Sequence, residues 1–269
     1  MKHYGLLGKT LGHSWSAPIH EAIFHHLGME GAYGLYPTEE SAVPALLDDI
    51  RRGELDGLNV TIPYKQVVIS HLDAITKEAE AIGAVNTISR EGDRLVGHNT
   101  DYFGFQSLLV RNDVPTVGQR VMVLGSGGAC RTVVACLKDM GAKAIYVVSR
   151  DPEQASKAIG DINVIGYDHI VDTEVDVLVN TTPAGMTGFP ADLPMDVEAI
   201  PKVKAAVDLV YNPLETPLLG YCKKRGAKTV NGLYMLVAQA VKAEEIWQKT
   251  TIDQAVIDEI DRLMMEQMA

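Results

Sequence analysis

The sequence predicts an α/β fold with two domains, one a Rossmann-type doubly wound parallel sheet and the other a smaller α/β domain with a mostly parallel sheet. Two observations lead to this prediction. Short apolar segments alternate with helical patterns along most of the chain, which is typical of βαβ units. A glycine-rich segment at residues 125–131 follows one apolar segment and opens a helix, as in dinucleotide-binding folds.

Composition excludes several classes of protein. The chain has 269 residues, enough for two domains, and its 46% hydrophobic content supports buried cores. A net charge of −11 without a basic stripe excludes a nucleic-acid partner. Cys130, Cys136 and Cys222 fit neither a disulfide framework nor metal-ligand spacing, so no metal is expected. With no signal peptide and no apolar run of membrane-spanning length, we expect a soluble, cytoplasmic protein with no membrane partner.

Apolar periodicity gives the expected elements of the first half. We expect strands at residues 4–8, 33–36, 55–60, 83–88 and 94–98, the last two paired through a turn at Gly92 and Asp93. We expect helices after Pro18 (apolar positions Ile19 to Leu27), at residues 41–52 and 76–82, and after Asn99.

The second half has the pattern of a parallel doubly wound sheet. We expect strands at residues 121–124, 144–149, 163–166, 175–180, 205–210 and 228–230. We expect helices from the glycine-rich segment to Met140 and at residues 152–159, 233–247 and 252–265.

Polar residues follow the strand that ends near Thr61, in the segment Asn59-Val60-Thr61-Ile62-Pro63-Tyr64-Lys65. Pro63 suits the first turn of a helix, which would place Lys65 in that turn. The helix dipole disfavours a cation there, lowers its proton affinity and so suits proton transfer. A solvated surface lysine is the alternative, and the segment taken alone favours it.

Two serines, Ser14 and Ser16, lie at the start of the first helix. Hydroxyls and backbone N–H groups at a helix N-terminus suit a carboxylate ligand, although a serine there is more often an N-cap. At the segment 99–101, Thr100 or Asp101 is similarly interpretable as a cap of the helix that follows.

Residues of the glycine-rich segment have expected structural roles in dinucleotide binding. Gly125 permits the tight turn, Gly127 lets the backbone approach a pyrophosphate, and small Cys130 replaces the third glycine of the fingerprint. Another phosphate ligand, or only a tight turn, are the alternatives. After the next strand, Ser149 and Arg150 stand where a ribose is held, and Arg150 suits a 2′-phosphate, which favours NADP over NAD. A surface pair of Arg150 with Asp151 is the alternative.

Two further segments suit a ligand. Residues 180–186 lie at the carboxyl edge of the same sheet, where ligands of doubly wound folds bind, with a structural turn as the alternative. Gly232 opens a helix on which Met235 and Gln239 share a face. Because an unpartnered buried glutamine is costly, Gln239 points either at a ligand or to solvent.

Taken together, these segments resemble the shikimate dehydrogenase family. The matches follow the family order along nearly the whole chain: G-L-L-G-K and H-S-W-S near the start, N-V-T-I-P-Y-K, G-A-V-N-T, N-T-D at 99–101, G-S-G-G-A, N-T-T-P-A-G-M, D-L-V-Y-N-P at 208–213 and N-G-L-Y-M-L-V-A-Q at 231–239.

The resemblance implies a substrate domain at residues 1–101, completed by helices in 233–269, and an NADP-binding Rossmann domain at 102–232, with the active site in the cleft between them. It implies reversible NADPH-dependent reduction of 3-dehydroshikimate to shikimate, in the biosynthesis of chorismate and aromatic amino acids. The partner is then a small-molecule substrate, and both a monomer and a homodimer remain open.

The resemblance also implies roles for matching residues. Ser14 and Ser16 would hold the shikimate carboxylate, and Lys65 and Asp101 would be the catalytic pair. Other substrate-binding positions are Asn59, Thr61, Asn86, Tyr211 and Gln239. Cofactor-binding positions are Gly125, Ser126, Gly127, Gly128, Ala129, Ser149, Arg150, Gln154, Thr181, Met186, Leu209, Gly232 and Met235.

Two positions depart from the family pattern. Ala17 stands where proline is common, with Pro18 one place later, and Gln154 replaces the second arginine that contacts the 2′-phosphate. The loss of that arginine leaves NAD use open, so a quinate/shikimate dehydrogenase with relaxed cofactor choice is the nearest alternative. A non-catalytic dinucleotide-binding sensor is an alternative of another class.

Overall fold

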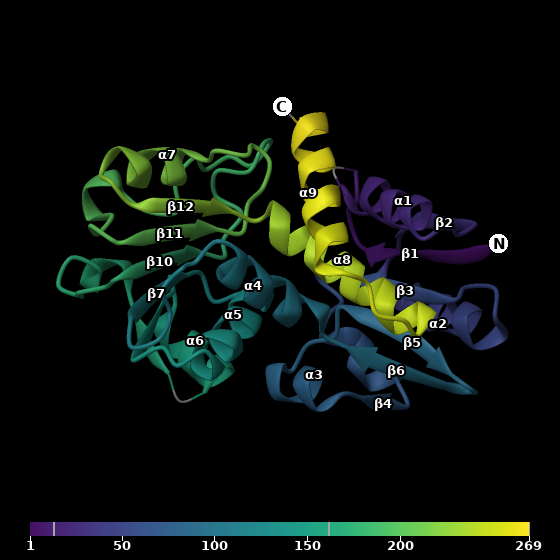
Figure 1. Cartoon of the computed structure of the whole chain (residues 1–269). Helices are drawn as coiled ribbons and strands as arrows, with labels where there is room; N and C mark the ends of the chain where they lie inside the picture. Colours follow the sequence, from purple (N-terminus) through teal and green to yellow (C-terminus); the bar gives the residue numbers. More distant parts are fainter. Residues whose placement is uncertain (13, 161, 269) are drawn as a thin grey trace. The chain divides into compact units, whose positions relative to one another are not determined.

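The computed structural model describes residues 1–12, 14–160 and 162–268. These residues form two compact units (Figure 1). The first unit comprises Met1–Gly104 and Leu236–Met264, and the second comprises Phe105–Met235 and the residues from Met265 onward. Each unit therefore contains segments that are distant in the sequence.

The first unit is built on a mixed sheet with the strand order β2-β1-β3-β5-β6-β4. β1 is parallel to β2 and β3, β4 is parallel to β6, and β5 is antiparallel to β3 and β6. The β5–β6 turn lies at Gly92 and Asp93, as expected. The strands are β1 (Lys2–Gly8), β2 (Gly31–Pro37), β3 (Gly57–Val60), β4 (Ala74–Ile75), β5 (Thr87–Glu91) and β6 (Arg94–His98). The helices are α1 (Ser16–His26), η1 (Glu40–Ala42), α2 (Val43–Arg52), η2 (Val67–His71) and α3 (Lys77–Ile82), with most of α8 (Leu233–Gln248) and α9 (Gln254–Met268).

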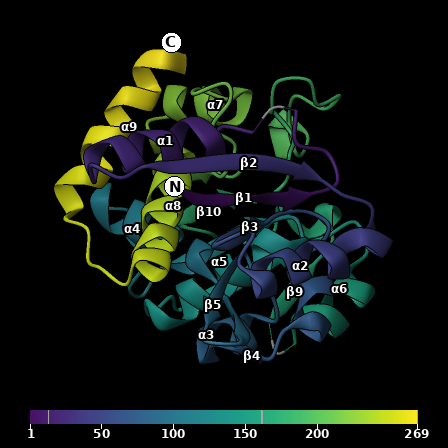
Figure 2. The same cartoon turned by 90° about the vertical axis from the view of Figure 1, so that its right-hand side faces the viewer.

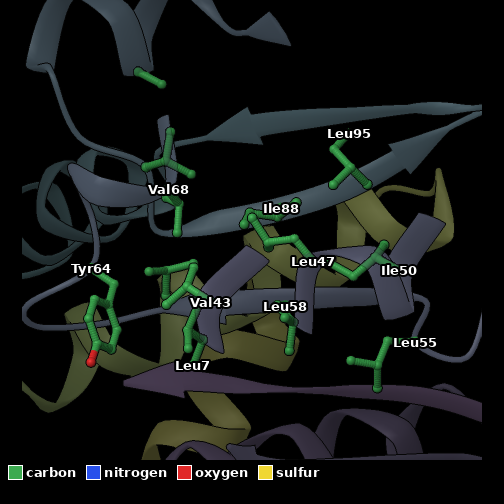
Figure 3. Close-up of a cluster of buried hydrophobic side chains, with 13 residues drawn as sticks. Leu7, Val43, Leu47, Ile50, Leu55, Leu58, Tyr64, Val68, Ile88 and Leu95 are labelled. Carbon is green, nitrogen blue, oxygen red and sulfur yellow. The ribbon is translucent and has the colours of Figure 1, made fainter. Parts of the chain in front are cut away.

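The two faces of this sheet are buried against different helices, because successive strand side chains point to opposite faces. On one face, Leu7, Leu58 and Ile88 join a cluster with α2 and η2 (Figure 3). On the other face, Tyr4 packs with Phe24 of α1 and Trp247 of α8. Helix α1 runs beside β2 (Figure 2). Both faces of β1 and β3 are therefore covered.

The second unit contains a fully parallel sheet with the strand order β12-β11-β10-β7-β8-β9. Its strands are β7 (Arg120–Leu124), β8 (Ala144–Val148), β9 (Asn163–Ile165), β10 (Val177–Asn180), β11 (Ala205–Asp208) and β12 (Lys228–Asn231). Its helices are α5 (Gly128–Asp139), α6 (Pro152–Ile159), η3 (Tyr167–His169), η4 (Val197–Ala199) and α7 (Pro217–Lys224), with most of α4 (Thr100–Arg111). The strand order reverses between β7 and β10, and doubly wound folds bind ligands at such a switch point.

One local prediction is wrong. Residues 62–66 form turns rather than the start of an α-helix, the Ile62–Pro63 peptide bond is cis, and the 3-10 helix η2 begins only at Val67. The Lys65 carbonyl accepts the backbone N–H of Val85 at 2.8 Å, and the Tyr64 side chain is buried in the core (Figure 3). This backbone is thus engaged by tertiary contacts, and the helix-dipole argument for Lys65 does not hold.

The sequence analysis also missed α7. The helix has a recognisable start, since the Thr216 side chain caps it by accepting the N–H of Leu219 and Pro217 occupies the first turn. Among the described residues, no helix has the length and apolar character needed to cross a membrane.

Candidate active site

An ammonium–carboxylate pair lies at the carboxyl end of β3. The Lys65 Nζ donates a hydrogen bond to Asp101 Oδ2 over 2.6 Å, and the side chains are 21% and 15% exposed. The pair is thus sheltered but accessible to a small molecule, unlike the solvated lysine that the segment alone favoured.

Asn99, rather than Asp101, caps the helix that begins here. The Oδ1 of Asn99 accepts the N–H of Tyr102 at 3.2 Å, so the residue that caps the first turn of α4 is neither Thr100 nor Asp101. The cap is therefore one residue before Thr100, the nearer of the two expected positions. Because Asn99 caps the turn, the Asp101 carboxylate is available to face Lys65.

Asn86 fixes the neighbouring residue, Thr100. Its Oδ1 accepts the backbone N–H of Thr100 at 2.7 Å, and its Nδ2 donates to Thr100 Oγ1 at 3.0 Å. The Thr100 hydroxyl also lies 3.4 Å from Gln239 Oε1, and the Gln239 amide donates to the carbonyl of Leu236 at 2.8 Å. Gln239 is only 8% exposed, so the alternative in which it reaches solvent is wrong.

Asn59 and Thr61 continue this polar surface from β3. The buried Asn59 Nδ2 donates to Thr87 Oγ1 at 3.0 Å and to the carbonyl of Asn86 at 3.3 Å. The backbone N–H of Thr61 donates to the carbonyl of Leu7 at 2.8 Å, which extends the β1–β3 pairing by one residue. Asn59 and Asn86 are thus brought together.

The two candidate serines contact each other. The Ser14 hydroxyl donates to Ser16 Oγ at 3.1 Å, and the Ser16 N–H donates to Ser14 Oγ at 3.2 Å. The N-cap residue of α1 is Trp15, which makes no side-chain cap bond, so neither serine is the N-cap. The histidine of the H-S-W-S motif, at position 13, lies outside the described residues.

In the second unit, the glycine-rich turn follows β7 at the switch point. Gly125 has φ of +92°, and a Cβ there would lie 2.7 Å from Thr182 Cγ2. The Thr181 hydroxyl donates to the carbonyl of Leu124 at 2.7 Å, which ties the loop after β10 to the turn.

The space above the turn suits a phosphate. A Cβ added at Gly127 or Gly128 would meet no described atom within 4 Å, so protein packing does not require glycine at either position. Gly128 and Ala129 open α5, where the first N–H groups have no partner within the helix and attract anions. Open space at these glycines is compatible with the expected pyrophosphate.

The end of β8 forms the other part of this site. Ser149 Oγ lies 3.0 Å from Ser126 Oγ, which links β8 to the glycine-rich turn. Ser149 and exposed Arg150 line a pocket with Tyr167 and residues around it. Asp151 caps α6 by accepting the N–H of Gln154 at 3.0 Å, so Asp151 has a structural partner apart from Arg150.

A buried network that the sequence analysis missed holds the loop after β10. Asn180 Nδ2 donates to Asp208 Oδ1 at 2.9 Å, and Asn180 Oδ1 accepts the N–H of Thr182 at 3.0 Å. The Thr216 hydroxyl donates to Asp208 Oδ2 at 2.7 Å. Burial raises the pKa of Asp208 to about 6. The available signal was an aspartate inside the apolar run 205–210.

The remaining candidates lie in the same unit. A Cβ at Gly232 would lie 2.1 Å from the carbonyl oxygen of Leu209, so these two positions are in close contact. Met235 is 9% exposed, whereas Met186 is 43% exposed. Tyr211, expected to contact substrate, follows β11 in this unit, and burial raises its pKa.

No group of histidine, cysteine, aspartate or glutamate that could hold a metal occurs in the described part of the chain. The three cysteines are free and buried. The glycine-rich turn at the switch point of the second unit, and the ammonium–carboxylate pair among hydroxyl and amide groups in the first unit, are features of dinucleotide-dependent oxidoreductases.

Comparison with known proteins agrees with this class. Residues 6–88 match the family model described as the shikimate dehydrogenase substrate binding domain. A shikimate dehydrogenase (NADP(+)) from Clostridium perfringens is 43% identical over 263 residues, covering 97% of each chain. A chorismate mutase/shikimate 5-dehydrogenase fusion protein from Clostridium acetobutylicum has a TM-score of 0.96 at 44% identity, covering 100% of this chain and 98% of that chain.

A third relative has been solved with ligands. Shikimate 5-dehydrogenase from Thermus thermophilus, in complex with NADP(H) and shikimate, has a TM-score of 0.87 at 35% identity, covering 97% of this chain and 99% of that chain. The chain belongs to the shikimate dehydrogenase family. The resemblance stated from the motifs and the predicted fold class are both confirmed.

Proposed function

We propose that this chain is an NADP-dependent shikimate dehydrogenase, which reversibly reduces 3-dehydroshikimate to shikimate on the route to chorismate and the aromatic amino acids. Membership of the family supports the reaction. The observation that carries the proposal is the 2.6 Å contact between Lys65 Nζ and Asp101 Oδ2, at the edge of a network of hydroxyl and amide groups.

Binding of the substrate follows from these groups. The hydroxyls of Ser14 and Ser16 donate to the substrate carboxylate, which an acidic chain with a net charge of −11 can hold only through local donors. The other substrate-binding side chains are those of Asn59, Thr61, Asn86, Tyr211 and Gln239. Amides and hydroxyls both donate and accept, so they match the hydroxyl groups of shikimate.

The reaction moves a hydride and a proton. Bound NADP takes the hydride from the carbon that carries the 3-hydroxyl and returns it in the reverse direction. The proton of the 3-hydroxyl passes to the Lys65–Asp101 pair, and the Lys65 ammonium stabilises the developing negative charge on the oxygen. The Asp101 carboxylate orients both the lysine and the substrate hydroxyl.

The cofactor is held by the second unit. Gly125, Ser126, Gly127, Gly128 and Ala129 form the pyrophosphate site at the start of α5. The 2′-phosphate and ribose contacts come from Ser149, Arg150 and Gln154. The nicotinamide side is formed by Thr181, Met186, Leu209, Gly232 and Met235. In domain terms, we assign the substrate domain to residues 1–101 with 233–269 and the NADP domain to 102–232.

We further propose a cytoplasmic location, because this reaction draws on the NADP(H) of that compartment. The free state of Cys130, Cys136 and Cys222 is compatible with a reducing environment. Light scattering of the purified protein decides between a monomer and a homodimer.

The proposed function is tested by the absorbance of the reduced nicotinamide, with shikimate and quinate each paired with NADP and NAD. We expect rapid reduction with shikimate and NADP and much slower reduction in the other pairings. Comparable rates with quinate or NAD would indicate the broader quinate/shikimate class. Absence of reduction in all four pairings would indicate a non-catalytic dinucleotide sensor.

A further inference from the structure

A buried tyrosine connects two groups of candidate substrate-binding residues. Tyr33 lies on β2, is 8% exposed, and donates its hydroxyl hydrogen to Asn59 Oδ1 at 2.7 Å. The sequence analysis assigned it only to a strand. Its ring stacks on His20, with centroids 4.0 Å apart and planes 10° from parallel.

The Tyr33 phenol also lies near the Ser16 side chain. Burial raises the pKa of Tyr33 well above its usual range, while a hydrogen bond from Ser16 lowers it. The phenol hydrogen goes to Asn59, and the Ser16 side chain is a second polar neighbour of the same phenol. The Ser16 oxygen in turn accepts from Ser14 at 3.1 Å. The hydroxyls of Ser14, Ser16 and Tyr33 and the Asn59 amide therefore lie next to one another.

The network continues beyond Asn59. Its amide donates to Thr87 Oγ1 at 3.0 Å, and the Thr87 hydroxyl donates to Asn86 Oδ1 at 3.1 Å. Asn86 holds Thr100, the residue before Asp101. Tyr33 is therefore the link between the serine pair on the α1 side and the asparagines beside the Lys65–Asp101 pair.

The histidine on which the Tyr33 ring stacks is itself held in place. His20 Nδ1 lies 2.6 Å from Glu244 Oε1, and both side chains are fully buried. Glu244 belongs to α8 and also accepts from Gln248 at 3.0 Å. A side chain immobilised in this way loses little additional freedom when a ligand binds, which is the condition for a pre-organised site.

We propose that Tyr33 is a positioning residue for the substrate, whose hydroxyl fixes Ser16 and Asn59 in the orientation that receives shikimate. The inference rests on the proposed function, since it assigns Tyr33 to the substrate side of that site. It predicts that loss of the hydroxyl weakens shikimate binding in the ground state and in the transition state alike, because the Tyr33 hydroxyl bonds to Asn59 rather than to Lys65 or Asp101.

The test is Tyr33→Phe, which keeps the ring stacked on His20. We expect the KM for shikimate to rise roughly three- to tenfold, the value of one or two hydrogen bonds, with kcat within about twofold of wild type and the KM for NADP unchanged. The matched control is Tyr4→Phe, which removes a buried hydroxyl that accepts from Gln248 at 2.9 Å in the same unit. We expect this control to lower the melting temperature similarly and leave the KM for shikimate at the wild-type value.

A double variant tests the route through Ser16. If Tyr33 acts partly through Ser16, the fold-increase in KM of the double variant is smaller than the product of the increases measured for Tyr33→Phe and Ser16→Ala alone. An unchanged KM for shikimate in Tyr33→Phe, or an equal rise in Tyr4→Phe, would overturn the positioning role while wild-type activity leaves the proposed function intact. An inactive, folded wild-type protein would overturn the proposed function and this inference together.

Discussion

The Lys65 ammonium and the Asp101 carboxylate lie 2.6 Å apart although 36 residues separate them in the chain. Two backbone arrangements bring them together. The turn after β3 is fixed by the hydrogen bond from Val85 N–H to the Lys65 carbonyl, and the start of α4 is fixed by Asn86 and capped by Asn99. The proposed catalytic pair is therefore held from both sides by hydrogen bonds of neighbouring residues.

Replacing Lys65 removes one member of the pair that takes the proton and the cation that stabilises the developing charge. For Lys65→Met, which keeps the length of the side chain, we expect kcat to fall by about 10³-fold or more, with shikimate affinity changed little. Stopped-flow absorbance and equilibrium binding measure the two quantities. Lys157→Met, at an exposed lysine paired with Glu153, is the control and should have wild-type kcat. Undiminished turnover in Lys65→Met would exclude the proposed role.

The cofactor preference depends on Arg150. For Arg150→Ala, we expect the KM for NADP to rise about tenfold or more, while that for NAD stays within about twofold, because only NADP carries the 2′-phosphate. The matched control is Lys157→Ala. It also removes one positive charge, from α6, but Lys157 does not line the pocket that Arg150 lines. Equal changes in the two Michaelis constants would remove Arg150 from the 2′-phosphate site.

Substitution by alanine should mainly affect cofactor binding at Gly127 and mainly affect stability at Gly232. At Gly127 a Cβ meets no described atom, so Gly127→Ala should change the free energy of unfolding by less than about 1 kcal/mol while raising the KM for NADP. At Gly232 a Cβ would lie 2.1 Å from the Leu209 carbonyl oxygen, so Gly232→Ala should destabilise by about 1–3 kcal/mol. Urea unfolding and cofactor kinetics on both variants check this. A Gly127→Ala protein with normal NADP affinity would contradict the pyrophosphate assignment.

Asp208 gives stability a specific pH dependence. Its folded pKa is about 6, above the value of about 3.9 expected in the unfolded chain. Between these two values the folded state retains a proton that the unfolded state has lost, so this group's contribution to stability falls as the pH rises through the window and is constant above it. The full difference corresponds to about 3 kcal/mol.

Asp208→Asn tests this dependence because asparagine does not titrate. The free energy of unfolding of wild type minus that of the variant should decrease by up to about 3 kcal/mol as the pH rises from about 4 to above 6. Contributions from carboxyl groups elsewhere largely cancel in this difference. A difference that is independent of pH would show that Asp208 does not titrate in this range.

Much of the fold could be predicted because its signals are local. The buried β7, β10 and β11 appear as continuous apolar runs, and Gly92 with Asp93 marks the β5–β6 turn. The helix expected at Pro63 was wrong because a local proline rule competes with tertiary contacts of Tyr64 and Lys65. Helix α7 has an N-terminal signal at Thr216 and Pro217. That signal adjoins a loop, and no strong apolar periodicity marks the start of the helix.

The site could be predicted only in part for a similar reason. Lys65 and Asp101 occur in polar segments after strands, and their catalytic role was predicted only from the resemblance to the family. Tyr33 and Asp208 act from within apolar strands, so their sequence context indicates only burial. Their partners, Asn59 for Tyr33 and Asn180 for Asp208, lie 26 and 28 residues away and become apparent only in the folded chain.

The most direct test of the proposed reaction is the fate of the hydrogen on C3 of shikimate. With shikimate deuterated at C3 and NADP as acceptor, we predict that the wild-type protein transfers the deuterium to the reduced cofactor, as detected by mass spectrometry. We predict that Lys65→Met transfers it at a much lower rate. Reduced cofactor without deuterium, or no reduced cofactor from folded wild-type protein, would contradict the account.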